Sequence, residues 1–98
     1  WRKAAPNPDR ERELNWRLER EISTGLVGEI GIHSIDVANW FWKAKPVSVT
    51  AFGGVLNYED GREVADTIQV ILQYPMGQRF VYTSTLGSSY EGNYELFF

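Results

Sequence analysis

The sequence predicts an α+β domain, with an open, mainly antiparallel sheet and helices packed on one of its faces. Helical patterns fill the first half of the 98-residue chain, and strand patterns fill the second half. Helices and strands that come in blocks, rather than in alternation, are typical of an antiparallel sheet with its helices on one side. The length fits a single domain, and a composition of 43% apolar and 23% charged residues is that of an ordinary globular protein.

Two segments carry helical signals. Residues 9–20 are dense in strong helix formers and have opposite charges three and four positions apart. Residues 28–42 repeat apolar side chains at helical spacing, which predicts an apolar side made of Ile30, Val37, Ala38 and Phe41. Residues 43–46 end this second helix, because they place cations in its last turn and a proline just beyond. The pair Trp40 and Trp42 near its end is expected to pack on the sheet.

Strand signals follow the helices. Residues 47–57 are rich in β-branched and apolar side chains. Residues 66–74 alternate, so one face of this strand is expected to carry Ile68, Val70, Leu72 and Tyr74. Residues 78–86 form the partner strand across a tight turn at residues 74–77. A further strand is expected at residues 94–98.

The strand aromatics predict an exposed apolar sheet face formed by Phe80, Tyr82, Tyr90 and Tyr94. A large apolar face needs a cover, so we expect a homodimer or higher oligomer that assembles through the sheet. Arg62 and Arg79 are expected to be surface charges of the hairpins, because isolated arginines near turns usually stay solvated.

Composition also excludes several partners. A net charge of −3 argues against nucleic acid, which normally demands a basic surface. The chain has no cysteine and one histidine, so we expect no metal site. No apolar run approaches the ~20 residues that span a bilayer, and residues 1–20 are too polar for a signal peptide. We therefore expect no membrane partner and a cytoplasmic location.

One polar stripe of the second helix carries candidate chemistry. Glu29, His33 and Asp36 are spaced four and three residues apart, which places an imidazole between two carboxylates. A carboxylate can fix the tautomer of an imidazole and raise its basicity, so such a pair could take a proton from an alcohol. On spacing alone, a histidine that only caps or pairs within a polar stripe is the commoner interpretation. A metal site made by the same three residues is a weaker one.

The same helix resembles a motif of the Gfo/Idh/MocA family of oxidoreductases. Residues 28–36 (GEIGIHSID) are similar to its Gly-rich start, acidic residue and x-Gly-x-His-x-x-Asp pattern, and residues 37–40 to its apolar tail. Residues 45–51 (KPVSVTA) match the family's exit into the first strand. The later hairpins match as well, at residues 60–62, 66–67 and 74–77. The resemblance covers nearly all of the chain from Asn15 onward.

This resemblance implies an N-terminal Rossmann domain that binds NAD or NADP, and a C-terminal α/β domain of which residues 1–98 would be a part. The substrate, a sugar, inositol or related polyol, would lie between the two domains. The family's proton-transfer histidine maps onto His33, and its acidic position, more often Asp, maps onto Glu29. The trailing Asp maps onto Asp36, as a substrate contact or a structural residue. Trp16 and Arg17 precede the helix, where they could face the substrate or only pack.

The cofactor side of such an enzyme is not expected in this chain. No G-x-G-x-x-G follows a strand, and the Lys-Pro at residues 45–46 stands at the helix exit rather than in a cofactor domain. We therefore expect no cofactor-binding residue and no activity of the chain alone. Because the chain begins at Trp1 and not at Met, we expect it to be a piece of a longer protein. Two alternatives stay open, namely a non-catalytic α+β interaction or assembly module, and a parent enzyme that performs nicotinamide-assisted elimination or glycoside cleavage.

Overall fold

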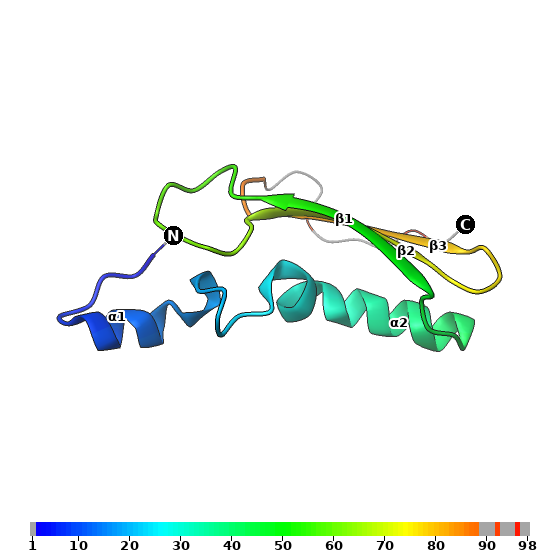
Figure 1. The fold of residues 1–98 in the computed structure, drawn as a ribbon, viewed down its shortest axis with the longest axis horizontal. Helices are drawn as coiled ribbons and strands as arrows, with labels where there is room; N and C mark the ends of the chain where they lie inside the picture. Colours follow the sequence, from blue (N-terminus) through cyan, green and yellow to red (C-terminus); the bar gives the residue numbers. More distant parts are fainter. Residues whose placement is uncertain (1, 89–91, 93–95, 97–98) are drawn as a thin grey trace.

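Helices and a sheet form two layers in the computed structural model, which describes residues 2–88, 92 and 96 (Figure 1). The chain runs through three short helical segments, then a longer helix, and then three strands (Figure 1). The elements are α1 (Pro8–Leu14), a 3-10 turn (Trp16–Leu18), a π turn (Val27–Gly31), α2 (Ile32–Trp42), β1 (Ser48–Gly54), β2 (Thr67–Gln73) and β3 (Arg79–Thr85). The α+β prediction, with helices on one side of an antiparallel sheet, is confirmed. Within the described ranges no helix is long and apolar enough to cross a membrane.

The sheet is antiparallel, with β2 in the centre. Val70 of β2 lies opposite Ala51 of β1 and Tyr82 of β3, and this register sets which side chains share a face. The predicted tight turn joins β2 to β3, where the Gly77 N–H donates to the Tyr74 carbonyl at 3.0 Å. Gly77 has φ 85°, a conformation that glycine adopts without strain. The strand predicted at residues 94–98 falls, apart from Leu96, outside the described residues.

The core lies between β2 and α2. The alternating β2 face is confirmed, because Val70, Leu72 and Tyr74 are buried and pack with Ala38 of α2. Tyr74 is 0% exposed, and its hydroxyl donates to Asn39 Oδ1 at 2.6 Å. Partly buried side chains surround this cluster, namely Val27, Ile35, Trp42, Ala44, Ile68, Phe80 and Tyr82. Burial of these apolar side chains holds α2 against the sheet, so the opposite side of the helix faces away from the sheet.

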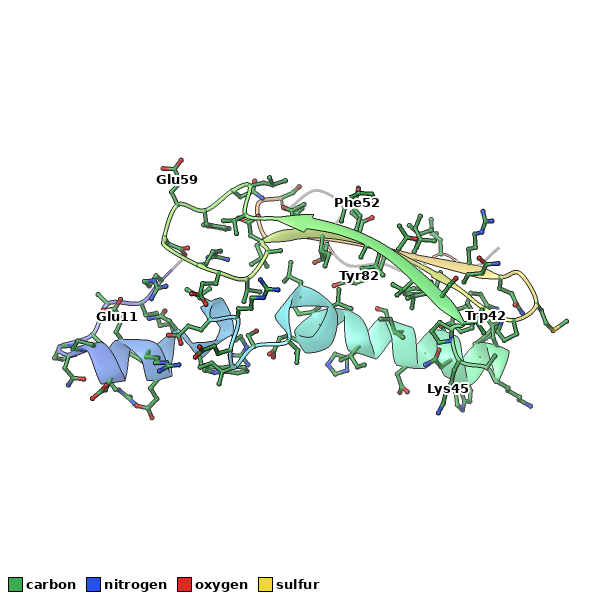
Figure 2. All side chains as sticks on the ribbon, in the orientation of Figure 1. Glu11, Trp42, Lys45, Phe52, Glu59 and Tyr82 are labelled. Carbon is green, nitrogen blue, oxygen red and sulfur yellow. The ribbon has the colours of Figure 1, made fainter. Side chains whose placement is uncertain are left out.

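The predicted exposed face of the sheet is wrong for two of its members. Phe80 and Tyr82 lie on the α2 side of the sheet, because the register pairs them with the buried Leu72 and Val70. Figure 2 shows Tyr82 on the α2 side of the sheet and Phe52 on the other side. The uncovered face is instead formed by Thr50, Phe52, Ile71, Val81 and Thr83. Tyr90 and Tyr94 lie outside the described residues.

The predicted apolar side of the second helix is also largely wrong. Of the four residues named for it, Ala38 is buried at 1% exposure, whereas Ile30, Val37 and Phe41 are exposed. The side that meets the sheet is instead Gly31, Ile35, Ala38 and Trp42. Trp40, also expected to pack on the sheet, is 77% exposed. The helix carries apolar residues around most of its circumference, and small residues decide which side can approach the sheet closely.

Two tryptophans two positions apart test this orientation. The Trp42 ring meets the ring of Tyr74 edge-on, with 4.6 Å between the centroids, while Trp40 points away from the core. We expect Trp42→Ala to lower the free energy of unfolding by roughly 3 kcal/mol through loss of core packing. Trp40→Ala is the matched control and should change it by no more than about 0.5 kcal/mol. Urea denaturation of both variants checks this, and equal losses would contradict the orientation of α2.

Candidate functional site

The start of α2 is built from glycines that make close contacts. Gly31 is buried, and a Cβ at this position would lie 2.9 Å from Tyr82 Cζ. At Gly28, a Cβ would collide with the side chain of Thr24. Both glycines lie in the π turn Val27–Gly31, which widens the first turn of the helix. Single π turns are frequent at functional sites, since they redirect side chains without breaking the helix.

The predicted polar stripe faces away from the sheet. His33 and Asp36 are exposed, about half a turn around the helix from the buried Gly31 and Ala38. Exposed Trp40 continues the same side toward the end of the helix. The imidazole is therefore accessible, and no described residue engages it through a hydrogen bond or ion pair. This outward face of α2 is where a second domain or a substrate could meet the histidine.

Glu29 is engaged by the segment before the helix. Its carboxylate lies 3.8 Å from Arg17 Nε and accepts from the hydroxyls of Ser23 at 3.4 Å and Thr24 at 3.5 Å. Among residues 2–88, no hydrogen bond or ion pair joins Glu29 to His33. The π turn explains the difference from the predicted stripe, because a wider turn rotates Glu29 relative to the α-helical residues that follow.

Arg17, together with Trp16, lies beside Glu29. The Arg17 guanidinium lies 4.4 Å from the centroid of the Trp16 ring, a cation–π contact. The Arg17 side chain remains 67% exposed, although it faces Glu29. The structure thus groups Trp16, Arg17 and Glu29, whereas His33 and Asp36 lie about one and two turns farther along the helix.

A hollow of about 430 Å³ opens beside this group. The volume lies within the range of small-molecule sites. Its walls come from the N-terminal lead-in, the α1 region, the start of α2, the β1–β2 loop and the end of β3, and are formed by Lys3, Leu14, Asn15, Arg17, Leu18, Ser23, Gly25, Leu26, Glu29, Ile30, Arg62, Val64, Ala65 and Leu86. Three of these residues are basic and one is acidic. His33 does not line the hollow, and it follows Glu29 by four residues on the same helix.

Asn15 fixes the N-terminal lead-in over this hollow. It is 4% exposed, and its side chain accepts from the Lys3 N–H at 2.7 Å and donates to the Lys3 carbonyl at 2.6 Å. Its amide group also donates to the carbonyl of Glu11 at 2.7 Å. The contact with Lys3 was not predictable from local sequence, because the fold brings the Lys3 backbone, twelve residues away, close to Asn15.

The β1–β2 loop closes the other side through a buried carboxylate. Asp66 accepts from the backbone N–H groups of Leu56, Asn57 and Tyr58 at 2.9, 2.8 and 3.0 Å. Burial alone would raise the pKa of Asp66, but these three donors outweigh it and hold the pKa at about 2. The carboxylate therefore stays ionised and holds the loop to the start of β2.

Arg62 belongs to the same loop and corrects a prediction. It was expected at the surface, but it is only 8% exposed. Its side chain donates two hydrogen bonds to Asp60, of 2.9 and 2.7 Å. Its guanidinium also lies 4.5 Å from the ring centroid of Tyr58. The bond from Arg62 holds the pKa of Asp60 at about 2. Arg79 is exposed on β3, as predicted.

The position of Glu29 gives a test in solution. We expect Glu29→Gln to shift the NMR signal of the Arg17 side-chain Nε–H, because it removes the facing charge. The ring signals of His33 should stay in place, because no described contact joins the two side chains. Arg17→Lys and His33→Asn identify the two signals by their disappearance. A displaced His33 signal together with an unchanged Arg17 signal would contradict this arrangement.

The described residues do not fit a nicotinamide cofactor. Its pyrophosphate is normally held by a glycine-rich turn between a strand and a helix, with the phosphate on the helix N-terminus. Here Gly25, Gly28 and Gly31 follow no strand, and two of them already pack closely on Thr24 and Tyr82. Within the described ranges, no group of three or more His, Cys, Asp or Glu residues could hold a metal ion.

Comparison with known protein families gives a match over the whole chain. A family model described as the GFO/IDH/MocA C-terminal domain matches residues 1–98. No curated protein and no solved structure matches the chain. The matched family consists generally of oxidoreductases that are usually NAD(P)-dependent. The helix motif around His33, the antiparallel sheet and a match over the whole chain agree, and the chain belongs to the Gfo/Idh/MocA family as a C-terminal domain.

Proposed function

We propose that this chain is the substrate-side domain of an NAD(P)-dependent oxidoreductase that acts on a sugar, inositol or related polyol. The observation that carries the proposal is the outward face of α2. His33 lies on this face and makes no hydrogen bond or ion pair with a described residue. Exposed apolar side chains surround it, namely Ile30, Val37, Trp40 and Phe41. A surface of this kind suits contact with a second domain, and contact there would enclose the histidine at a domain junction.

The chemistry assigned to the chain is proton transfer. When a hydroxyl carbon is oxidised, the hydroxyl must lose its proton, and a neutral imidazole is the side chain most often used as such a base. His33 is the only histidine of the sequence and is exposed to an incoming hydroxyl. Asp36, one turn farther along and also exposed, could orient a neighbouring hydroxyl. Since the described residues form no nicotinamide site, the hydride step is assigned to another part of the enzyme.

Assembly through the sheet is part of the same proposal. The uncovered face carries Phe52, which is 74% exposed, and Val81, which is 64% exposed, among threonines. β-Branched and aromatic surfaces of this kind pack well on a second sheet. A homodimer would cover this face on both copies, with an isologous contact. We also propose that the protein is cytoplasmic.

Activity of the intact protein tests the proposal. We expect reduction of NAD⁺ or NADP⁺, followed by absorbance, with at least one substrate from a panel containing D-glucose, myo-inositol and D-glucuronate. The 98-residue chain alone should show no micromolar binding of NADH or NADPH in a fluorescence titration. Micromolar binding of NADH or NADPH by the chain alone would contradict the assignment of cofactor binding to another part of the protein.

The second candidate is a non-catalytic assembly module, which the open sheet face favours. A Rossmann fingerprint and a Lys-Pro motif upstream in the parent gene would favour the enzyme, and a parent gene without both would favour the module. Product analysis of the intact enzyme separates simple dehydrogenation from nicotinamide-assisted elimination or glycoside cleavage.

A further inference from the structure

We propose that the hollow beside Glu29 binds a carboxylate group, so that the substrate is a sugar acid or an acidic polyol and not a neutral sugar. Among the described residues that line it, three are basic, Lys3, Arg17 and Arg62, and one is acidic, Glu29. The whole chain has a net charge of −3, so this concentration of positive charge runs against the overall balance. A concave site lined mainly by one sign of charge attracts ligands of the opposite sign.

The three cations differ in what they can offer a ligand. Arg62 donates two hydrogen bonds to Asp60, and the carboxylate of Asp60 offsets the charge of Arg62. Within residues 2–88, Arg17 has one ion pair, a long one of 3.8 Å to Glu29, which leaves most of its N–H donors available. No ion pair of Lys3 occurs within the part of the chain that the structure describes. Lys3 and Arg17 are therefore the two groups that can receive an anion.

The side chain of Arg17 and the backbone of Lys3 are positioned in advance. The backbone of Lys3 is bonded to Asn15 in both directions, at 2.7 and 2.6 Å. Arg17 lies over the Trp16 ring and faces Glu29, whose carboxylate also accepts from Ser23 and Thr24. Glu29 is thus a positioning residue for Arg17. Side chains held in place before binding lose less freedom when the ligand arrives, which strengthens binding.

The walls and the charge balance point to a carboxylate in an organic molecule. Apolar side chains line much of the hollow, among them Leu14, Leu18, Leu26, Val64 and Ala65. An apolar wall strengthens a nearby charge interaction and can pack on a carbon skeleton. Once Asp60 offsets Arg62, the charged residues left among the described lining are Lys3 and Arg17 against Glu29. The remaining single positive charge matches a carboxylate better than a phosphate dianion.

The inference rests on the proposed function, because the substrate must reach both the hollow and His33. Glu29 lines the hollow, and His33 follows it four residues later, about one helical turn along. One sugar unit can span this separation. The carboxylate would then sit near Arg17, while a hydroxyl of the same molecule faces the imidazole.

The test compares two ligands that share a ring. D-glucuronate carries a carboxylate where D-glucose carries a hydroxymethyl group, and both are titrated into the intact protein by calorimetry, with NAD⁺ and separately with NADP⁺ present. We expect D-glucuronate to bind at least about tenfold more tightly. Arg17→Gln should abolish this preference and Lys3→Gln should reduce it, whereas Arg79→Gln, on the far face of the sheet, should leave it unchanged.

Several outcomes would overturn the inference. They are equal affinity for the two ligands, absence of binding by both, and a preference that survives both Arg17→Gln and Lys3→Gln. Tighter binding of D-glucose 6-phosphate than of D-glucuronate would replace the carboxylate by a phosphate and so overturn it too. Failure of the proposed function is separate, because His33→Asn should remove turnover and leave the D-glucuronate preference intact.

Discussion

Gly31→Ala is expected to destabilise the protein, although a Gly→Ala change within a helix normally stabilises it by about 0.5–1 kcal/mol. The added Cβ would lie 2.9 Å from Tyr82 Cζ and 3.0 Å from Cε1, closer than packed atoms tolerate. Relief requires the Tyr82 ring or the whole of α2 to move. We expect a net loss of roughly 1–3 kcal/mol in the free energy of unfolding, measured by urea denaturation.

A second substitution separates this cause from a general effect on the helix. Tyr82→Leu removes the ring atoms that the new Cβ would meet. The double variant Gly31→Ala, Tyr82→Leu should therefore lose less stability than the two single variants added together, by about 0.5 kcal/mol or more. Additive losses, or a stabilising Gly31→Ala, would show that Gly31 does not set the distance between α2 and the sheet.

Asp66→Asn is expected to cost roughly 2–3 kcal/mol of stability. The Asp66 side chain is 0% exposed and receives three backbone N–H bonds. An amide removes the charge and turns an NH₂ group toward those donors, so at least one buried N–H loses its partner. Glu59→Gln is the matched control, because Glu59 points outward from the same loop (Figure 2). Thermal unfolding of the two variants measures the difference, and equal losses would contradict the role of Asp66.

The pH dependence of stability follows from the same carboxylates. The pKa values of Asp66 and Asp60 are both lowered to about 2 in the folded protein. Their contribution is present above the unfolded pKa, near 3.9, and is lost as the pH falls through about 2. Stability should therefore drop between about pH 4 and pH 2, and Asp66→Asn should flatten this drop. An identical acid profile in the variant would show that Asp66 is not held as an ion.

The alternating positions of the buried side chains made the central strand predictable. Val70, Leu72 and Tyr74 stand at every second position and enter the core, while Ile71 and Gln73 between them lie on the opposite, exposed face. The tight turn after β2 was predictable for a similar local reason, because proline and glycine impose the required backbone angles. Such features depend only on neighbours along the chain.

The orientation of α2 was not predictable from its apolar residues. Val37, Trp40 and Phe41 are as apolar as the residues that pack, yet they are exposed. The close contact is made by Gly31 against Tyr82, a partner 51 positions away along the sequence. A pattern within one helix cannot show where a distant ring allows that helix to approach.

The candidate site was predictable only in part, and for related reasons. Spacing placed His33 and Asp36 on one side of the helix, where the structure has them. It did not foresee the π turn that leaves Glu29 facing Arg17. The burial of Asn15 was not predicted and Arg62 was predicted at the surface, since polar side chains are usually exposed and their partners here are set by the fold.

The central claim is that His33, on the outward face of α2, transfers the hydroxyl proton of the substrate. Its most direct test is the turnover of His33→Asn in the intact protein, with the substrate that the wild-type enzyme oxidises. Because His33 is exposed, stability should change by no more than about 0.5 kcal/mol. We expect kcat to fall by about 100-fold or more, with KM little changed. A kcat within about twofold of wild type would contradict the assignment, since loss of a general base costs far more than that.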